Sequence, residues 1–196
     1  MIEDEKGWGL RWRLSSEDAG KDTRNACTNT PVMIIACKLY QITREQKYLD
    51  DALKLFDYCT YQMVNDNGAV SKSPNILTYT QGTWIEGCRL LYHITGDSRY
   101  MERATTCVTY TMSPSGACTT AAGILRGEGQ SADQSNFKGG LIPYMVNYAN
   151  DPSMPSDKRK EVAEFLVRNG EMLWRNNMDR SKYPKMFANF SWELPY

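Results

Sequence analysis

One segment of the chain occurs twice, and this repeat constrains the fold more than any other feature. Residues 40–52 read Tyr-Gln-Ile-Thr-Arg-Glu-Gln-Lys-Tyr-Leu-Asp-Asp-Ala, and residues 92–104 read Tyr-His-Ile-Thr-Gly-Asp-Ser-Arg-Tyr-Met-Glu-Arg-Ala. The copies are offset by 52 residues. A period near fifty with helix–turn–helix content indicates an array of helical hairpins, in which each hairpin packs on its neighbours.

Each copy contains the end of one helix, a tight turn and a return helix. In the second turn, Gly96 suits the left-handed position after a helix, and Asp97 suits the N-cap of the next helix. In the first turn, Thr43 and Gln46 have the spacing of a capping box. We therefore expect Thr43 to cap the first return helix.

The hydrophobic pattern predicts six main helices in an all-α fold. In the first return helix, Leu49, Ala52, Leu53 and Phe56 share one face at helical spacing. The expected helices are 28–42, 45–64, 80–95, 97–112, 134–150 and 155–177. Segments 65–75 and 113–133, rich in Gly, Pro and Asn, separate the hairpins, and strand signal is nearly confined to 117–126. The length of 196 residues fits a single domain, 1–196.

The composition excludes several classes of function. The 23 Lys and Arg residues balance 23 Asp and Glu residues, so the chain lacks the cationic field of a nucleic-acid or membrane-surface binder. The longest apolar stretch, 32–37, is too short to span a bilayer. Six cysteines without a CxxC pair, and one histidine, provide no usual ligand spacing, so we expect no metal and no cofactor. The cysteines in helical stretches are expected to be buried, reduced thiols.

Polar and aromatic residues gather where the first, third and fifth expected helices begin. In an array of antiparallel hairpins these three N-termini lie at one end. The residues are Trp8, Trp12, Asn25 and Asn29, then Tyr79, Gln81, Gly82 and Trp84, then Glu128, Asp133, Gln134, Phe137, Lys138 and Gly139. Amides and carboxylates bind hydroxyl groups, and the C–H face of a sugar packs on an aromatic ring, so their convergence predicts a carbohydrate site. The alternative is that Asn25, Asn29 and Asp133 cap helices and the aromatic residues fill the core.

At these residues the sequence resembles glycoside hydrolase family 76, the bacterial endo-α-1,6-mannanases and their fungal cell-wall relatives. Residues 7–12 (Gly-Trp-Gly-Leu-Arg-Trp) resemble the family's Gly-Gly-x-x-Trp turn, and residues 25–31 (Asn-Ala-Cys-Thr-Asn-Thr-Pro) resemble its Lys-Asn-x-x-Ser-Asn segment. Residues 79–82 (Tyr-Thr-Gln-Gly) are similar to its Tyr-Asn-Gln-Gly, with Thr where Asn is usual. Residues 133–139 (Asp-Gln-Ser-Asn-Phe-Lys-Gly) are similar to its Asp-x-x-x-Phe-Lys-Gly. The resemblance, over about residues 7–150, implies part of an (α/α)6 toroid, about six of its twelve helices.

The resemblance also implies a ligand and a set of binding residues. The ligand is an oligosaccharide or polysaccharide, α-1,6-linked mannan. The residues expected to line the sugar subsites are Trp12, Asn25, Asn29, Tyr79, Gln81, Asp133 and Lys138. Lys138 has an alternative role, an ion pair with Asp133 across a helical turn.

The family's catalytic centre has no counterpart in this sequence. It is an adjacent Asp-Asp pair among tryptophans, upstream of the Gly-x-x-Trp turn, and the chain therefore resembles the C-terminal half of a family member. Asp50 and Asp51 lie mid-helix, where we expect a solvated face rather than catalysis. Glu86 is expected to pair with Arg89. We expect no catalytic residue in this chain, and Glu128 is the one weak candidate.

Three functions stay open: a glycoside hydrolase, a non-catalytic glycan-binding array, and a helical interaction protein. Half a toroid would leave inward helix faces uncovered, so that Ile34, Ile35 and Leu90 would contact water. Such a patch predicts self-association, a compact repacking of the half-ring, or poor solubility. A secreted, periplasmic or cell-surface location is implied by the resemblance alone.

Overall fold

The structure, a computed structural model, describes residues 2–5, 7–12, 24–71, 75–181 and 183–195. Its helices are α1 (Ala26–Thr43), α2 (Gln46–Gln62), α3 (Thr78–Thr95), α4 (Ser98–Met112), α5 (Ala132–Asn136), α6 (Ile142–Asn150) and α7 (Ser156–Asn176). A 3-10 turn, η2 (Phe137–Gly140), joins α5 to α6. Two short antiparallel hairpins pair β1 (Ile2–Asp4) with β2 (Gly7–Gly9), and β3 (Met178–Asp179) with β4 (Phe187–Ala188). The all-α prediction is confirmed, although the sequence pattern did not reveal these two hairpins.

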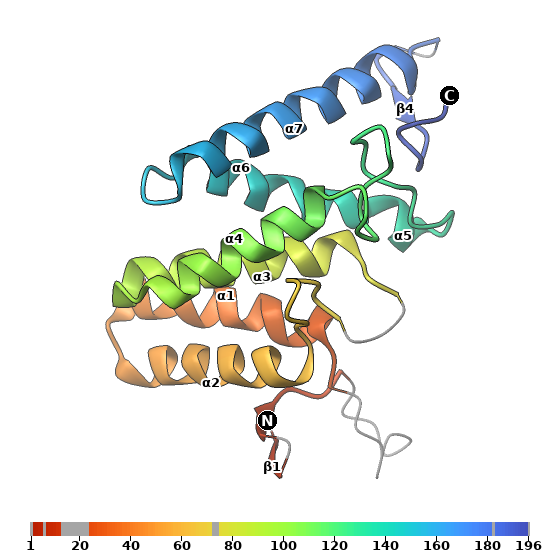
Figure 1. The fold of residues 1–196 in the computed structure, drawn as a ribbon. Helices are drawn as coiled ribbons and strands as arrows, with labels where there is room; N and C mark the ends of the chain where they lie inside the picture. Colours follow the sequence, from red (N-terminus) through yellow and green to blue (C-terminus); the bar gives the residue numbers. More distant parts are fainter. Residues whose placement is uncertain (1, 6, 13–23, 72–74, 182, 196) are drawn as a thin grey trace.

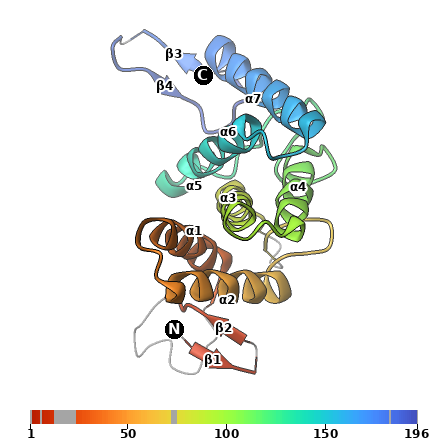
Figure 2. The ribbon, with the colours of Figure 1, turned by 90° about the vertical axis from the view of Figure 1, so that its left-hand side faces the viewer.

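The helices form two curved layers of antiparallel pairs. Figure 2 shows α1, α3 and α6 in one layer and α2, α4 and α7 outside them. α3 lies in the middle and packs on α1, α4 and α6. The N-termini of α1, α3 and α5 lie at the same end of the array, on the right of Figure 1.

The two turns of the repeat differ in their capping chemistry. Gly96 has φ 74° and Asp97 accepts a hydrogen bond from the Arg99 amide, which confirms both predictions for the second turn. In the first turn the prediction was wrong, because Arg44 takes the left-handed position with φ 62°. Thr43 is therefore the last residue of α1, and the N-cap of α2 is Glu45, which makes no side-chain capping bond.

The predicted helix over 134–150 is interrupted, and the backbone explains why. The chain changes from α5 to the 3-10 turn at Phe137 and restarts as α6 with a proline in its first turn. At the interruption, η2 approaches α3 so closely that a Cβ built on Gly82 would lie 2.5 Å from the Gly140 carbonyl oxygen. Glycine at positions 82 and 140 thus allows this close contact between η2 and α3.

An aromatic cluster fills the centre of the core. The Phe56 ring stacks on Trp84, with centroids 5.2 Å apart, and meets Tyr100 edge-on at 4.6 Å. All six cysteines are free, and all but Cys27 are buried, so the expected burial of the cysteines in helical stretches is confirmed. Burial raises the pKa of the Cys37 thiol to about 12, so this side chain packs as a small apolar residue.

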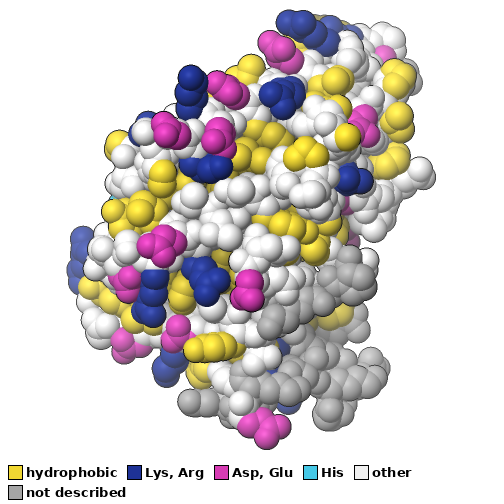
Figure 3. Space-filling model, viewed as in Figure 1, with side chains coloured by type: hydrophobic (Ala, Val, Ile, Leu, Met, Phe, Trp, Pro, Cys, Tyr) yellow, Lys and Arg dark blue, Asp and Glu magenta, His cyan; other side chains and the backbone are white. Residues whose placement is uncertain are grey.

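The inner helix faces are better covered than the sequence suggested. Ile34 and Leu90 are buried members of the hydrophobic core, so this part of the prediction was wrong: α1 packs on α2 and α3, and α3 packs on α1, α4 and α6. Ile35 on α1 and Val146 on α6 are exposed. Charged side chains of both signs are interspersed over the face in Figure 3. Within the described ranges, no helix has the length and apolar character needed to cross a bilayer.

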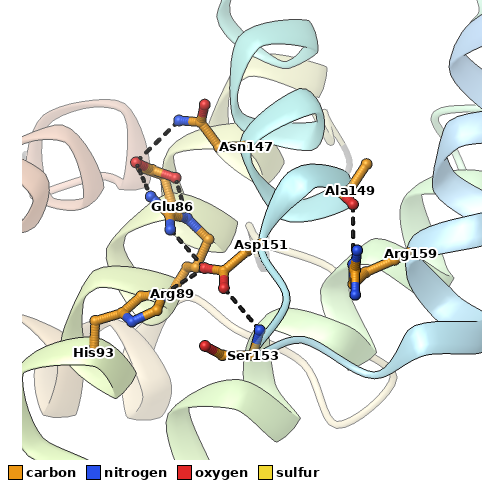
Figure 4. A network of polar contacts seen from close by, with 8 residues as sticks. All are labelled: Glu86, Arg89, His93, Asn147, Ala149, Asp151, Ser153 and Arg159. Atoms are coloured by element: carbon orange, nitrogen blue, oxygen red, sulfur yellow. Dashed lines mark hydrogen bonds and ion pairs between the residues drawn. The ribbon is translucent and has the colours of Figure 1, made fainter.

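A buried ionic network ties α3 to the turn between α6 and α7 (Figure 4). Arg89 donates to Glu86 from Nε and Nη2, each at 2.9 Å, which confirms the predicted pair, and from Nη1 to Asp151 at 2.7 Å. His93 also bonds Asp151, and Asn147 of α6 donates to Glu86 at 3.2 Å. Since every carboxylate here has a partner, the network holds α6 and α7 against the middle of the array.

Candidate functional site

The starts of α1, α3 and α5 meet through direct contacts. The hydroxyls of Thr30 and Thr83 lie 2.7 Å apart and join α1 to α3. The Tyr79 ring lies 4.6 Å from Phe137, which joins α3 to the end of α5. The structure therefore brings the three polar and aromatic clusters to one end of the molecule, where they surround the start of α3.

A cleft of about 740 Å³ opens at this end. Its walls are the segment that leads into α3, the loop that precedes α5, and α5 itself. It is lined by Asn75, Ile76, Leu77, Ala117, Arg126, Gly127, Glu128, Ser131, Asp133, Gln134 and Phe137. Of the residues singled out from the sequence, Glu128, Asp133, Gln134 and Phe137 thus face one shared cavity.

Glu128 closes the N-terminus of α3 from a distant loop. Its Oε1 accepts the backbone N–H of Thr78 at 2.6 Å and its Oε2 accepts the Thr78 hydroxyl at 2.5 Å. Leu77, at the N-cap position, supplies no side-chain bond, so Glu128 takes over this function. Burial raises the pKa of Glu128, and the two Thr78 hydrogen bonds oppose that rise. With both oxygens engaged, the carboxylate acts here as a helix cap.

Asp133 is the carboxylate of the cleft that remains available. It is exposed in the first turn of α5, whereas the capping box of that helix is formed by Ser131 and Gln134. Its carboxylate makes no hydrogen bond or ion pair with the described residues, including Lys138. It can therefore accept hydrogen bonds from hydroxyl groups in the cleft.

An aromatic wall and a chain of polar contacts connect this cleft to α1. Tyr79, half-buried beside Phe137, has its pKa raised by burial and by a hydrogen bond with Cys27. Cys27 donates to Asn25 Oδ1 at 2.9 Å, and the same oxygen accepts the Thr28 amide at 3.1 Å. Asn25 is thus the N-cap of α1, and it is linked to the aromatic wall through one cysteine.

Asn29 and Gln81 are buried, and the side-chain amide of each forms hydrogen bonds with the backbone of a residue distant in the sequence. Asn29 Oδ1 accepts the Leu10 N–H at 2.7 Å, and its Nδ2 donates to the Leu10 carbonyl at 3.1 Å. Gln81 makes the same paired contact with Val70, at 2.9 and 2.8 Å. Neither side chain exposes any surface. In this structure they hold the loops around the helix starts rather than face the cleft.

Lys138 and Trp12 also lie outside the lining of the cleft. Lys138 is 2% exposed, donates to the Phe190 carbonyl at 2.8 Å and lies 5.4 Å from the centre of the Trp192 ring. It therefore fastens the C-terminal segment, and the alternative pairing with Asp133 is not formed. Trp12 is 54% exposed, two residues after Leu10.

Several lining residues had no motif to reveal them. Asn75, Ile76 and Leu77 precede α3, and Ala117, Arg126 and Ser131 lie in the long segment before α5. The only available signal was that these stretches were rich in turn residues, since loops often carry binding groups on a rigid scaffold. The cleft offers an available carboxylate, a guanidinium, one hydroxyl, side-chain amides and a ring, which suits a hydroxyl-rich ligand.

Comparison with known proteins gives concordant similarities. A family model described as Glycosyl hydrolase family 76 matches residues 3–193. The mannan endo-1,6-alpha-mannosidase DCW1 of Candida glabrata is 29% identical over 111 residues, which are 50% of this chain and 25% of that protein. The protein of the same name from Saccharomyces cerevisiae is 29% identical over 114 residues, with 51% and 25% covered.

A solved structure is similar over nearly the whole chain. It is an inactive variant of an α-1,6-mannanase from Salegentibacter sp. HEL1_6, with two neighbouring aspartates changed to asparagine, in complex with α-1,6-mannotriose. It has a TM-score of 0.83 and 29% identity, covering 97% of this chain and 57% of that chain. The chain thus spans little more than half of that enzyme, and its match to the curated relatives spans about a quarter of theirs.

Proposed function

The chain belongs to glycosyl hydrolase family 76, and we propose on this premise that it acts on or binds α-1,6-linked mannan, with the cleft beside α5 holding part of the saccharide. Support comes from the similar mannanase, which was solved with α-1,6-mannotriose, and from the lining of the cleft. The observation that carries the proposal is Asp133, an exposed carboxylate in the cleft with no hydrogen bond to the described residues.

The binding roles divide between contact and positioning. Asp133 accepts sugar hydroxyls, and the Tyr79–Phe137 pair offers an aromatic edge for the apolar face of a mannose ring. Asn25, Asn29, Gln81 and Lys138 position the surrounding backbone through the contacts described above. Trp12, which is exposed, contributes a stacking surface if the glycan extends toward α1.

We assign no catalytic residue among the described residues. Glycoside hydrolysis requires two carboxyl groups on either side of one bond. Within the cleft, Glu128 is committed to the start of α3, which argues against its use as an acid. The adjacent Asp50 and Asp51 lie on the outer helix α2, where Asp50 is exposed and accepts a bond from Gln46 at 2.9 Å.

A binding titration tests the proposal directly. α-1,6-Mannotriose is titrated into the wild-type chain and into Asp133→Ala, with binding followed by calorimetry. Asp157→Ala is a matched control, because Asp157 is also exposed in the first turn of a helix, at the start of α7. We expect Asp133→Ala to bind at least tenfold more weakly and Asp157→Ala to bind like the wild type. Equal binding by all three proteins, or no binding by the wild type, contradicts the proposal.

A second measurement separates hydrolysis from binding alone. The chain is incubated with α-1,6-mannan and the release of reducing ends is followed. Release that persists in Asp50→Asn and Asp51→Asn would assign hydrolysis to other carboxylates. Mannotriose binding without release favours the non-catalytic glycan-binding alternative, and neither binding nor release favours a helical interaction protein.

We also propose that residues 1–196 form one domain that self-associates through its inner face. One continuous core runs from α1 through α3 to α6 and α7, which supports a single domain. Ile35 and Val146 are exposed apolar residues on the inner layer. Light scattering tests the association: we expect a dimer or larger species that Ile35→Lys weakens, and a monomer at every concentration contradicts it.

A further inference from the structure

A second groove lies on the outer face of the molecule, between α2 and α4. Its volume is about 450 Å³. Asp57, Thr60 and Tyr61 line it from α2, and Arg99, Glu102 and Arg103 line it from α4. It shares no lining residue with the cleft beside α5. Figure 3 shows acidic and basic side chains close together over these two helices.

Aromatic groups form the floor and one side of this groove. Phe56 lines the floor, and its ring is fixed by Trp84 on one side and Tyr100 on the other. Tyr61 is 75% exposed and stands at the side. A ligand in the groove would therefore meet the accessible Tyr61 ring, whereas Phe56 is 3% exposed and has the Arg99 guanidinium 6.0 Å from its ring centre.

The polar groups of the groove are partly fixed and partly available. Arg99 is held by Asp97, with Nε and Oδ2 3.0 Å apart, and it also donates to the Tyr100 hydroxyl at 3.0 Å. Arg103 makes no hydrogen bond or ion pair with the described residues. The Thr60 hydroxyl oxygen is buried and has no hydrogen-bond partner among the described residues. The groove therefore has one available donor, the Arg103 guanidinium, and one buried hydroxyl without a hydrogen-bond partner, that of Thr60.

The balance of charges restricts the class of ligand. An anion would face the carboxylates of Asp57 and Glu102, and a cation would face the guanidinium groups of Arg99 and Arg103. A purely apolar ligand would cover the carboxylate of Asp57 and the guanidinium of Arg103 without giving either a hydrogen-bond partner, which is costly. A neutral molecule with many hydroxyls can donate to the carboxylates and accept from the guanidinium groups while one of its faces packs on a ring.

We infer that this groove is a second, non-catalytic binding site for a neutral saccharide. Tyr61 supplies the stacking face, and Arg103, Asp57 and Glu102 supply hydrogen bonds to ring hydroxyls. Such a site would hold a distant part of a polysaccharide whose other part occupies the cleft. The choice of mannan as the probe rests on the proposed function, whereas the saccharide class rests on the groove itself.

The test is a titration of ¹⁵N-labelled protein with α-1,6-mannotriose, and separately with maltotriose and cellotriose, followed by amide chemical shifts. The variants are Tyr61→Ala, Arg103→Ala and Asp133→Ala. Tyr183→Ala is the control, because Tyr183 is a similarly exposed tyrosine in the loop between β3 and β4. We expect chemical-shift changes at residues 57–61 and 99–106 that Asp133→Ala leaves intact, and we expect Tyr61→Ala to weaken this binding about fivefold, since stacking is worth on the order of 1 kcal/mol.

The outcomes distinguish this inference from the proposed function. If chemical-shift changes occur only at residues of the cleft, and Tyr61→Ala binds like the wild type, the inferred groove site is wrong and the proposed function still stands. Groove shifts with maltotriose or cellotriose but not with mannotriose support the saccharide groove and count against mannan. If Tyr183→Ala weakens groove binding as much as Tyr61→Ala does, the stacking role of Tyr61 is wrong. Since Tyr61 and Arg103 lie at the surface of regular helices, retained far-UV circular dichroism verifies that each variant is folded.

Discussion

Glu128 accepts hydrogen bonds from both the backbone amide and the hydroxyl of Thr78, fifty residues earlier in the chain. One carboxylate thereby caps the central helix α3 and fixes one wall of the cleft. The contact couples the start of α3 to the loop that carries Glu128, because neither can move relative to the other without breaking two short hydrogen bonds.

Replacing Glu128 tests that relationship. We expect Glu128→Ala to lower the free energy of unfolding by about 1–2 kcal/mol, because it leaves the Thr78 amide uncapped. Glu128→Gln should cost less, because its amide oxygen can still accept one of the two bonds. Urea unfolding measures both. Equal stability of wild type and Glu128→Ala would show that solvent satisfies the start of α3 equally well.

Gly82 is required by packing rather than by backbone conformation. A methyl group there would lie 2.5 Å from the Gly140 carbonyl oxygen and 2.7 Å from the Leu141 Cα, both backbone atoms. We expect Gly82→Ala to lower the free energy of unfolding by about 1–3 kcal/mol, as overpacked core positions do.

Gly170 provides the matched control for Gly82. It lies within α7, is exposed, and has open space where a Cβ would be added. Gly170→Ala should therefore raise the free energy of unfolding by about 0.5–1 kcal/mol through helix propensity. Thermal or urea unfolding of the pair checks the opposite signs, and a neutral Gly82→Ala would refute the close backbone contact.

Asp151 should make stability depend on pH in the acid range. Burial alone would raise the pKa of Asp151, but hydrogen bonds from His93, Arg89 and the Ser153 amide outweigh it and lower the pKa from 3.8 to about 2. A depressed folded-state pKa means that the stabilisation is fully present above pH 3.8 and is lost as pH falls toward 2. The expected loss is on the order of 2 kcal/mol.

The Asp151→Asn variant isolates this contribution. Other carboxylates also titrate in acid, so the measured quantity is the difference between the two proteins in urea unfolding at pH 5 and at pH 2. We expect that difference to be large at pH 5 and small at pH 2. A difference that does not change with pH would mean that Asp151 acts through packing and not through its charge.

Lys138 should control the attachment of the C-terminal segment. Lys138→Met keeps an unbranched side chain but removes the bond to the Phe190 carbonyl, which leaves a part-buried acceptor unpaired. We expect faster hydrogen exchange in residues 187–192 and a loss of about 1–2 kcal/mol in the free energy of unfolding. This loss is limited because burial already lowers the pKa of Lys138 and so disfavours its charge. Lys185→Met, at an exposed position of the same segment, should change neither quantity.

The overall architecture could be predicted because its causes are local. The repeated segment, the apolar spacing around Phe56 and the turn residues Gly96 and Asp97 act over one or two helical turns, and they specified the helices and the second hairpin turn. The first turn was mispredicted because Thr43 and Gln46 have the spacing of a capping box. In the structure Arg44 takes the left-handed position that ends α1, and the N-cap of α2 is therefore Glu45. The break at η2 was missed because the close approach of Gly82 to Gly140 joins segments that are far apart in the sequence.

The candidate binding residues show the same difference between what local sequence predicts and what long-range contacts decide. The sequence by itself determined that Asn29, Gln81, Asp133 and Lys138 would be gathered near three helix starts, since hairpin topology alone brings those starts to one end. Only the tertiary structure decided which side chains are available there. Asn29 forms hydrogen bonds with the backbone of Leu10, Gln81 with that of Val70, and Lys138 with that of Phe190. Asp133 remains exposed. The physical reason is that a buried polar side chain is available to a ligand only if no distant part of the chain already hydrogen-bonds it. No local sequence pattern encodes such long-range partners.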